Sequence, residues 1–265
     1  MRFRVLLFLE EFEMKRKIRA LVLYFSLPEI LLWVASVVLV LGSFFVFDRE
    51  NYLTLVASLV GVTSLILNAK GNPLGQVLMV LFSVLYGVIS YSFSYYGEMI
   101  TYLGMTLPMA VLALISWLKN PFGEKRSEVK VSRLSKKAFF LILLVSALVT
   151  LVFGFILKAL ETANLALSTV SVTTSFLAVC LTFKRSRFFA LAYAANDLVL
   201  IALWILAAKS DMSYFSVVIC FAVFFVNDVY GFLSWSKMKK RQSRLSASKK
   251  ENGSAEEEEK KVLRN

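Results

Sequence analysis

The sequence contains no histidine, and only two cysteines occur among its 265 residues. Without histidine, His-ligated zinc or haem and histidine-based acid–base catalysis are excluded. Cys180 and Cys220 lie inside apolar runs, where packing is the usual role, so no disulfide framework is indicated. No phosphate-binding loop motif is present, which argues against direct ATP coupling. We therefore expect no metal, no cofactor and no catalytic residue, and we predict that the chain is not an enzyme.

Charge is scarce as well, whereas apolar residues dominate. Only 18% of the residues are charged, 58% are hydrophobic and the mean hydropathy is +0.70. A water-soluble fold of this length would have too little polar surface, so we predict an all-α integral membrane protein. A helix needs about 20 apolar residues to cross a bilayer. Eight runs qualify: Leu27 to Phe47, Tyr52 to Leu67, Leu74 to Phe93, Met99 to Leu118, Ala138 to Leu157, Ala163 to Phe183, Phe188 to Ala208 and Tyr214 to Trp235.

The basic residues are divided unevenly between the two ends of these runs. With the amino terminus inside the cell, 27 of the 30 lysines and arginines fall in inward segments, and Arg49, Lys158 and Lys209 fall outside. Cytoplasmic loops carry such an excess, so we expect a multi-pass protein of the cell membrane with both termini cytoplasmic. The net charge of +12 then reports topology, and no nucleic-acid partner is expected. Residues 1–19 do not resemble a signal peptide.

A short pattern occurs twice. Residues 115–119 (ISWLK) end the fourth run and residues 233–237 (LSWSK) end the eighth, at an offset of 118. An offset of four crossings indicates two parallel repeats, a known plan for transporters. We expect Trp117 and Trp235 to lie in the aromatic belt at the membrane interface. The expected units are an N-terminal cytoplasmic segment (1–26), a leading helix (27–47), repeat 1 (52–118), a basic cytoplasmic loop (119–137), a linker helix (138–158), repeat 2 (162–236) and a disordered tail (237–265).

Several motifs carry a resemblance to a known family. They are Tyr96-Gly97-Glu98, Pro108-Met109 and Trp117-X-Lys119 in the first half, and Asn227-Asp228-X-Tyr230-Gly231-Phe232-X-X-Trp235 in the second. Across residues 52–239 the chain resembles the PnuC family of nicotinamide riboside transporters. The resemblance implies three helices, a linker helix and three more, in a core like that of the SWEET sugar carriers. It also implies facilitated diffusion, a homo-oligomer that is a trimer, and trapping of the cargo by cytoplasmic phosphorylation.

One departure from the family pattern affects the expected site. Where many members carry Trp-X-X-Trp after the basic turn, this chain has Ala190 and Tyr193, with Phe188 and Phe189 beside them. The aromatic floor of the site is therefore altered. Relatives in this superfamily carry thiamine, riboflavin or other nucleosides, so these cargoes stay open beside nicotinamide riboside.

Helix geometry predicts the residues of a binding site. Polar and aromatic residues at three- and four-residue spacing share one helix face, and two such faces meeting across a pseudo-twofold axis form a pocket near mid-membrane. Asn227 is the preferred cargo contact, with Asp228 about 100° aside on the same helix. Asn196 and Asn227 have an alternative role in interhelical hydrogen bonds. The candidate substrate-binding residues are Asn227, Tyr230, Asn196, Tyr193, Asp197, Trp204, Gln76, Tyr86, Tyr102 and Thr106.

Charge narrows the expected small-molecule cargo. The span interiors contain no lysine or arginine but keep Asp197 and Asp228. A nucleotide phosphate would lack a partner there, whereas a cationic ring can stack on tyrosine or tryptophan. Nicotinamide riboside fits this description, and thiamine satisfies the same argument. A membrane enzyme using the two aspartates and a non-transporting scaffold are the competing classes.

Overall fold

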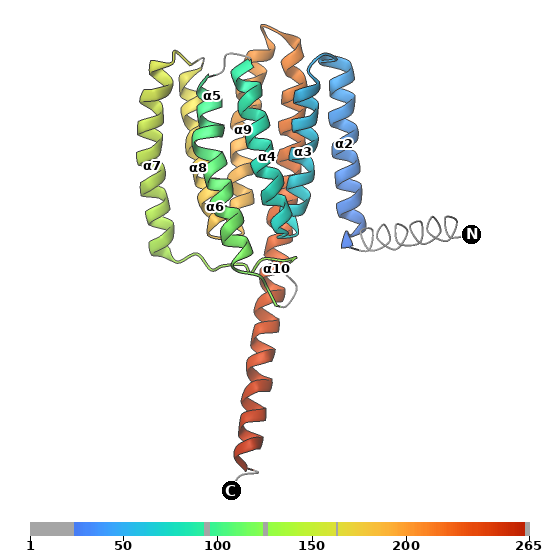
Figure 1. Cartoon of the computed structure of the whole chain (residues 1–265), viewed down its shortest axis with the longest axis vertical. Coiled ribbons are helices and arrows are strands. Elements are labelled where there is room, and N and C mark those ends of the chain that lie inside the picture. Colours follow the sequence, from blue (N-terminus) through green and yellow to red (C-terminus); the bar gives the residue numbers. More distant parts are fainter. Residues whose placement is uncertain (1–23, 93–95, 124–126, 163, 263–265) are drawn as a thin grey trace, which may run out of the picture.

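A computed structural model describes residues 24–92, 96–123, 127–162 and 164–262. In this part of the chain eight helices are long and apolar enough to cross a membrane, which confirms the predicted all-helical, multi-pass architecture (Figure 1). Most of the expected N-terminal segment falls on residues 1–23, outside the described part. The elements are α2 (Leu27–Phe47), α3 (Tyr52–Ala69), α4 (Pro73–Ser92), α5 (Tyr96–Ile100), a π-helical segment (Thr101–Thr106), α6 (Leu107–Leu118), α7 (Lys136–Ala159), α8 (Leu165–Phe183), α9 (Phe188–Ala208), a short 3-10 turn (Met212–Tyr214) and α10 (Phe215–Val262).

Six of the spanning helices form a closed ring. Around it α3 packs on α4, α4 on α6, α6 on α8, α8 on α9, α9 on α10 and α10 again on α3. The two remaining helices lie outside at opposite edges of the bundle, α2 against α3 and α10, and α7 against α8 (Figure 1). This arrangement is the predicted leading helix followed by a three-plus-one-plus-three core.

Trp117 and Trp235 join the two repeats, and Trp117 lies in the last turn of α6. That end of α6 is the end of the bundle from which α10 emerges (Figure 1). Both indoles have no exposed surface, and their ring centroids lie 5.3 Å apart. The Trp117 indole donates to the carbonyl of Thr182 at 3.0 Å, and the Trp235 indole donates to the carbonyl of Asn68 at 2.7 Å. Each acceptor is the last residue but one of the first helix of the opposite repeat. The expected place in an exposed interface belt is therefore wrong, because a buried indole N–H needs a protein acceptor.

The serine before each tryptophan repeats the same contact. Ser116 donates to the carbonyl of Phe183 at 2.9 Å, and Ser234 donates to the carbonyl of Ala69 at 2.7 Å. We call Ser116-Trp117 and Ser234-Trp235 the Ser-Trp anchors. Each anchor hydrogen-bonds the last two carbonyls of a helix in the opposite repeat, so the repeated sequence pattern has a structural cause.

Helix α10 runs on far below the bundle (Figure 1). It continues to Val262, where the sequence analysis predicts a disordered tail from residue 237. The prediction counted how little the tail can bury. It gave too little weight to intrinsic propensity, because lysine, glutamate, alanine and arginine are strong helix formers and extend a helix that the bundle has already nucleated.

Candidate functional site

A small cavity lies inside the helix ring, near the middle of the spans. Both repeats contribute to its wall. It encloses about 40 Å³ and is lined by Gly61, Leu65, Met79, Phe82, Tyr102 and Thr106 from repeat 1, and by Ser175, Tyr193, Asn196, Asp197, Phe221, Phe224 and Asp228 from repeat 2. The predicted meeting of two helix faces at mid-membrane is thus present.

The repeat 2 wall is polar and buried. Asn196, Asp197 and Asp228 are each at most 5% exposed. The Oδ1 atom of Asn196 accepts from the hydroxyl of Thr174 at 2.7 Å and from that of Ser175 at 2.9 Å. These two bonds fix the amide, so that its donor end is left for another acceptor.

Asp197 on α9 and Asp228 on α10 face each other in the cavity wall. Their carboxyl groups are close enough to interact electrostatically. The Oδ2 atom of Asp197 is buried without a hydrogen-bond partner among the described residues. Isolated carboxylates are costly at membrane depth, so this pair is suited to a cationic or hydrogen-bond-donating guest.

The repeat 1 wall depends on the π-helical segment, which contributes Tyr102 and Thr106. Pro108 has no N–H to donate, and the wider turn just before it lets the Leu107 N–H reach the carbonyl of Tyr102. The Thr106 hydroxyl donates to the carbonyl of Thr101 at 3.2 Å. A π-helical turn and a proline therefore lie together at the cavity, and both are common causes of helix kinks.

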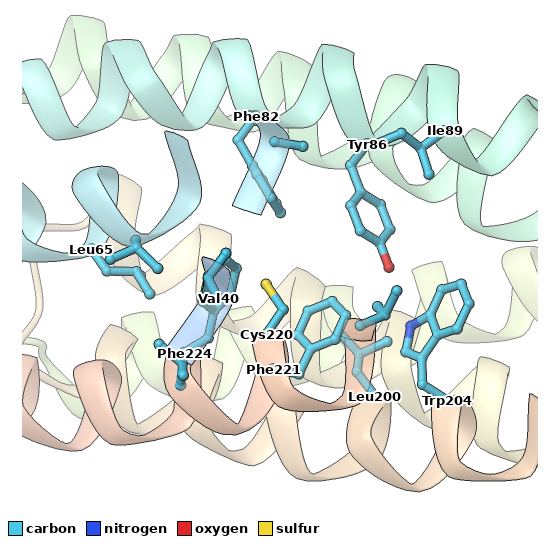
Figure 2. Close-up of a cluster of buried hydrophobic side chains, with 14 of the residues drawn as sticks. Val40, Leu65, Phe82, Tyr86, Ile89, Leu200, Trp204, Cys220, Phe221 and Phe224 are labelled. Atoms are coloured by element: carbon cyan, nitrogen blue, oxygen red, sulfur yellow. The ribbon is translucent and has the colours of Figure 1, made fainter. Parts of the chain in front are cut away.

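Aromatic rings close the cavity on the side away from the Ser-Trp anchors. The rings of Tyr86 and Tyr102 lie 4.4 Å apart, and Phe221 contacts Tyr86 at 6.0 Å. Figure 2 shows the hydroxyl of Tyr86 directed across the bundle toward Trp204. Tyr86 and Trp204 thus lie in the packed layer beyond the cavity.

The predicted site residues divide into two groups. Tyr193, Asn196, Asp197, Tyr102 and Thr106 line the cavity. Tyr86, Trp204, Gln76, Asn227 and Tyr230 do not. Within the second group, Gln76 donates to the Oδ1 of Asn68 at 2.8 Å and so joins α4 to α3.

Asn227 and Tyr230 face the leading helix α2. The amide of Asn227 donates to the hydroxyl of Ser36 at 2.9 Å and to the carbonyl of Val223 at 2.8 Å. The Tyr230 hydroxyl donates to Glu29 at 3.3 Å, and Glu29 also forms an ion pair with Lys70 at 2.9 Å. The expected 100° rotation between Asn227 and Asp228 is present, but Asp228 is the one that reaches the cavity.

Most of the apolar lining was not predicted from the sequence, and the face of α10 that lines the cavity carries Asp228 rather than the preferred Asn227. A signal was available, because Phe221, Phe224 and Asp228 recur at three- and four-residue spacing. On α4 the lining residues are Met79 and Phe82, whereas the sequence prediction chose Gln76 and Tyr86 on that helix. On α3, Gly61 leaves space for the ring of Phe224, because a Cβ atom at position 61 would lie 2.3 Å from that ring.

Packed side chains lie on both sides of the cavity along the helix axes. The Ser-Trp anchors and Phe189 lie on one side of it, and the Tyr86–Trp204 layer lies on the other. Small-molecule sites usually measure about 300–1,000 Å³, so a cavity of about 40 Å³ is too small for a vitamin-sized guest. A vitamin-sized guest requires the helices to separate, which is the motion expected of a carrier.

Comparisons with known proteins agree with this architecture. A family described as nicotinamide mononucleotide transporter matches residues 51–237. The nicotinamide riboside transporter PnuC of Neisseria mucosa is 30% identical over 204 residues, which cover 75% of this chain and 77% of the relative. The protein of the same name from Haemophilus influenzae is 22% identical over 215 residues, covering 81% and 92%.

A solved structure shares the fold as well. The crystal structure of a vitamin B3 transporter PnuC matches with a TM-score of 0.72 and 25% identity, covering 82% of this chain and 94% of the other. The sequence motifs, the helix order and the matched residues lead to one conclusion. The chain belongs to the PnuC family of membrane transporters.

Proposed function

We propose that this chain carries nicotinamide riboside across the cell membrane into the cell. The observation that supports this cargo is the pair of buried carboxyl groups, Asp197 and Asp228, in a mid-membrane cavity. The pyridinium ring of nicotinamide riboside is a planar cation. It would be neutralised by the carboxyl pair and stacked on Tyr102, Tyr193 or Phe82. The donor end of Asn196 would bond the carboxamide or a ribose hydroxyl.

The same cavity disfavours a phosphorylated cargo. Among the described residues its lining contains two carboxyl groups and no lysine or arginine. A phosphate would enter the low-dielectric interior beside like charges and without a cation to bind it. Of the two cargoes that appear in the names of the family and its relatives, the riboside therefore fits better than the mononucleotide.

The proposed mode of transport rests on the family resemblance. In this proposal the carrier works by facilitated diffusion as a homo-oligomer, a trimer by family resemblance, and cytoplasmic phosphorylation traps the product. The new phosphate then prevents return through a cavity that repels anions. The excess of lysine and arginine around the Ser-Trp anchors supports a cytoplasmic position for that end and for both termini.

Uptake into liposomes tests the proposal. Purified protein is reconstituted, and entry of labelled nicotinamide riboside, nicotinamide mononucleotide, thiamine and riboflavin is compared. We expect rapid riboside entry without any ion gradient and no entry of the mononucleotide. If only thiamine enters, the cargo is thiamine, and the argument that the carboxyl pair selects a cation still holds. Entry of riboflavin or of the mononucleotide alone would overturn that argument.

A matched variant connects uptake to the site. Asp197→Asn together with Asp228→Asn removes the charge while keeping the shape of both side chains. Riboside uptake should be lost although the protein still elutes as a folded oligomer. Unchanged uptake by this double variant would contradict the proposed role of the carboxyl pair.

A further inference from the structure

A second and much larger cavity lies at the anchor end of the bundle, outside the spans. It measures about 600 Å³. Three segments that are distant in sequence form it: residues 120–122 and 130–133, which we call the connector loop, the turn between α8 and α9, and the extension of α10. Four basic residues line it, namely Lys130, Arg133, Arg185 and Lys239.

Charge in this cavity is unbalanced. No aspartate or glutamate lines it within the part of the chain that the structure describes. The charges of Arg133 and Arg187 both act on Lys239, so the basic groups repel one another. A neighbouring cavity of about 430 Å³ has two glutamates beside its three basic residues, and there Glu29 pairs with Lys70 and Glu128 pairs with Arg241. The contrast indicates that the first cavity is suited to an anion.

Arg185 is held in a strained position at this cavity. Its φ of +53° is left-handed, and in repeat 1 the corresponding turn residue is Gly71 with a φ of +66°. In both turns this residue's N–H bonds the carbonyl that also accepts from a Ser-Trp anchor indole, Thr182 or Asn68. A non-glycine residue in this conformation costs of order 1 kcal/mol, and such strain often accompanies function.

The guanidinium of Arg185 is only partly used by the protein. One terminal nitrogen donates to the hydroxyl of Ser116 at 2.9 Å. Its Nε is buried and has no partner among the described residues. Burial lowers the pKa of Arg185, since desolvation disfavours its charge, yet no described carboxylate compensates it. Free guanidinium donors are the groups that recognise phosphate in a two-pronged geometry.

The walls of the cavity are held in place. Gln242 on α10 is 5% exposed, accepts from the Val131 N–H at 2.8 Å and donates to the carbonyl of Val129 at 3.0 Å. The N–H of Ser132 donates to the carbonyl of Arg185 at 3.0 Å. The connector loop is thus fastened to both of the other segments, and the cavity is a built feature of the fold.

We propose that this cavity binds a phosphate ester through Arg133, Arg185, Lys130 and Lys239. Its volume is in the range typical of sites for nucleotide-sized molecules. A bound phosphate would join the connector loop to both elements of repeat 2 and relieve the repulsion among the four cations. The site is separate from the mid-membrane cavity, and its occupancy does not depend on which cargo is carried.

Two sources can supply the same chemistry, a soluble phosphorylated metabolite or the headgroup of an anionic lipid. Equilibrium dialysis of the purified oligomer with labelled adenosine monophosphate tests the first, with adenosine as the uncharged control. Native mass spectrometry after exchange into phosphatidylglycerol tests the second. Arg133→Gln with Arg185→Gln, and separately Lys130→Gln with Lys239→Gln, should each weaken binding by about tenfold or more. If the variants lose binding of one probe, the result supports the site and identifies that probe's class as the ligand.

A matched control removes the same charge from the opposite end of the helices. Lys158→Gln with Lys209→Gln should leave binding of both probes unchanged. The lysine pair decides the matter if the arginine pair does not fold. The proposal is overturned if neither probe binds the unaltered protein at about 1 mM, or if binding survives in the pocket variants. Because the readout is binding alone, failure here differs from failure of the proposed transport.

Discussion

The two repeats make matching contacts through their Ser-Trp anchors, but they contribute different kinds of side chain to the cavity. The Ser-Trp anchors make matching hydrogen bonds to opposite helices, through Trp117 to Thr182 and through Trp235 to Asn68. At the cavity, repeat 1 contributes mostly rings and aliphatic groups, whereas repeat 2 contributes both carboxyl groups and Asn196. In our proposal the symmetric anchors stabilise the fold, and the asymmetric cavity wall binds the cargo.

This division has a physical reason. The anchors satisfy backbone carbonyls, which every helix end presents regardless of the cargo. A cation with one flat ring, by contrast, needs counter-charge on one side and a π-face on another. A cavity with two identical walls would either bring four carboxyl groups together or have none.

The largest expected effect is loss of the charged wall. Each of Asp197→Asn and Asp228→Asn should lower riboside uptake by roughly 10- to 150-fold, because a bond to a charged group contributes about 1.5–3 kcal/mol. Initial uptake rates in liposomes measure this. Asp211→Asn, which removes an exposed carboxylate from the turn before α10, is the matched control and should be silent. Equal losses in all three variants would deny any special role to the cavity pair.

The next effect tests the shared part of the repeats. Trp117→Phe and Trp235→Phe should each lower the free energy of unfolding by about 1–3 kcal/mol, since each removes the indole donor from a buried carbonyl. Thermal unfolding midpoints in one detergent compare them. Trp33→Phe should cost less, because that indole is 38% exposed and bonds Thr63 at 3.2 Å. If one substitution lowers the unfolding midpoint strongly and the other does not, the two Ser-Trp anchors are not equivalent.

A smaller effect is expected on the aromatic wall. Tyr102→Leu should lower riboside uptake by roughly 3- to 30-fold, because a cation–π contact contributes about 0.5–2 kcal/mol. Tyr102→Phe keeps the ring face and should retain most of the uptake. The ratio of the two rates is the measurement. If Phe is as poor as Leu, the hydroxyl matters and the wall is not simply a stacking surface.

Sequence reasoning reached the fold almost completely, since apolar run length and the lysine and arginine bias depend only on composition along the chain. The first helix, Leu27–Phe47, and the seventh span, Phe188–Ala208, begin and end at the predicted residues. The longer α10 was missed because Met238 and Gln242 are buried in contacts with the connector loop that the sequence does not reveal, and because local propensity favours helix beyond them.

The site was reached only in part, for a reason visible at Asn227 and Asp228. Adjacent residues on a helix point about 100° apart, and sequence alone does not say which of two directions faces the cavity. The polar residue that drew attention faces α2, because the leading helix provides Ser36 as a partner. Polarity identifies what must be satisfied, but not whether a helix or a cargo satisfies it.

The smallest expected effect resolves that ambiguity at Asn227. Its amide nitrogen is occupied by Ser36 and Val223, yet its Oδ1 is buried with no partner among the described residues. If Asn227 only joins α10 to α2, Asn227→Ala and Ser36→Ala should each reduce stability by about 0.6 kcal/mol, an average interhelical bond in a membrane, and leave uptake nearly unchanged. If the free oxygen meets the riboside when the helices separate, Asn227→Ala alone should lower uptake. Paired measurements of unfolding midpoint and riboside uptake on the two variants therefore decide whether recognition is confined to the present cavity or extends along α10 toward the leading helix.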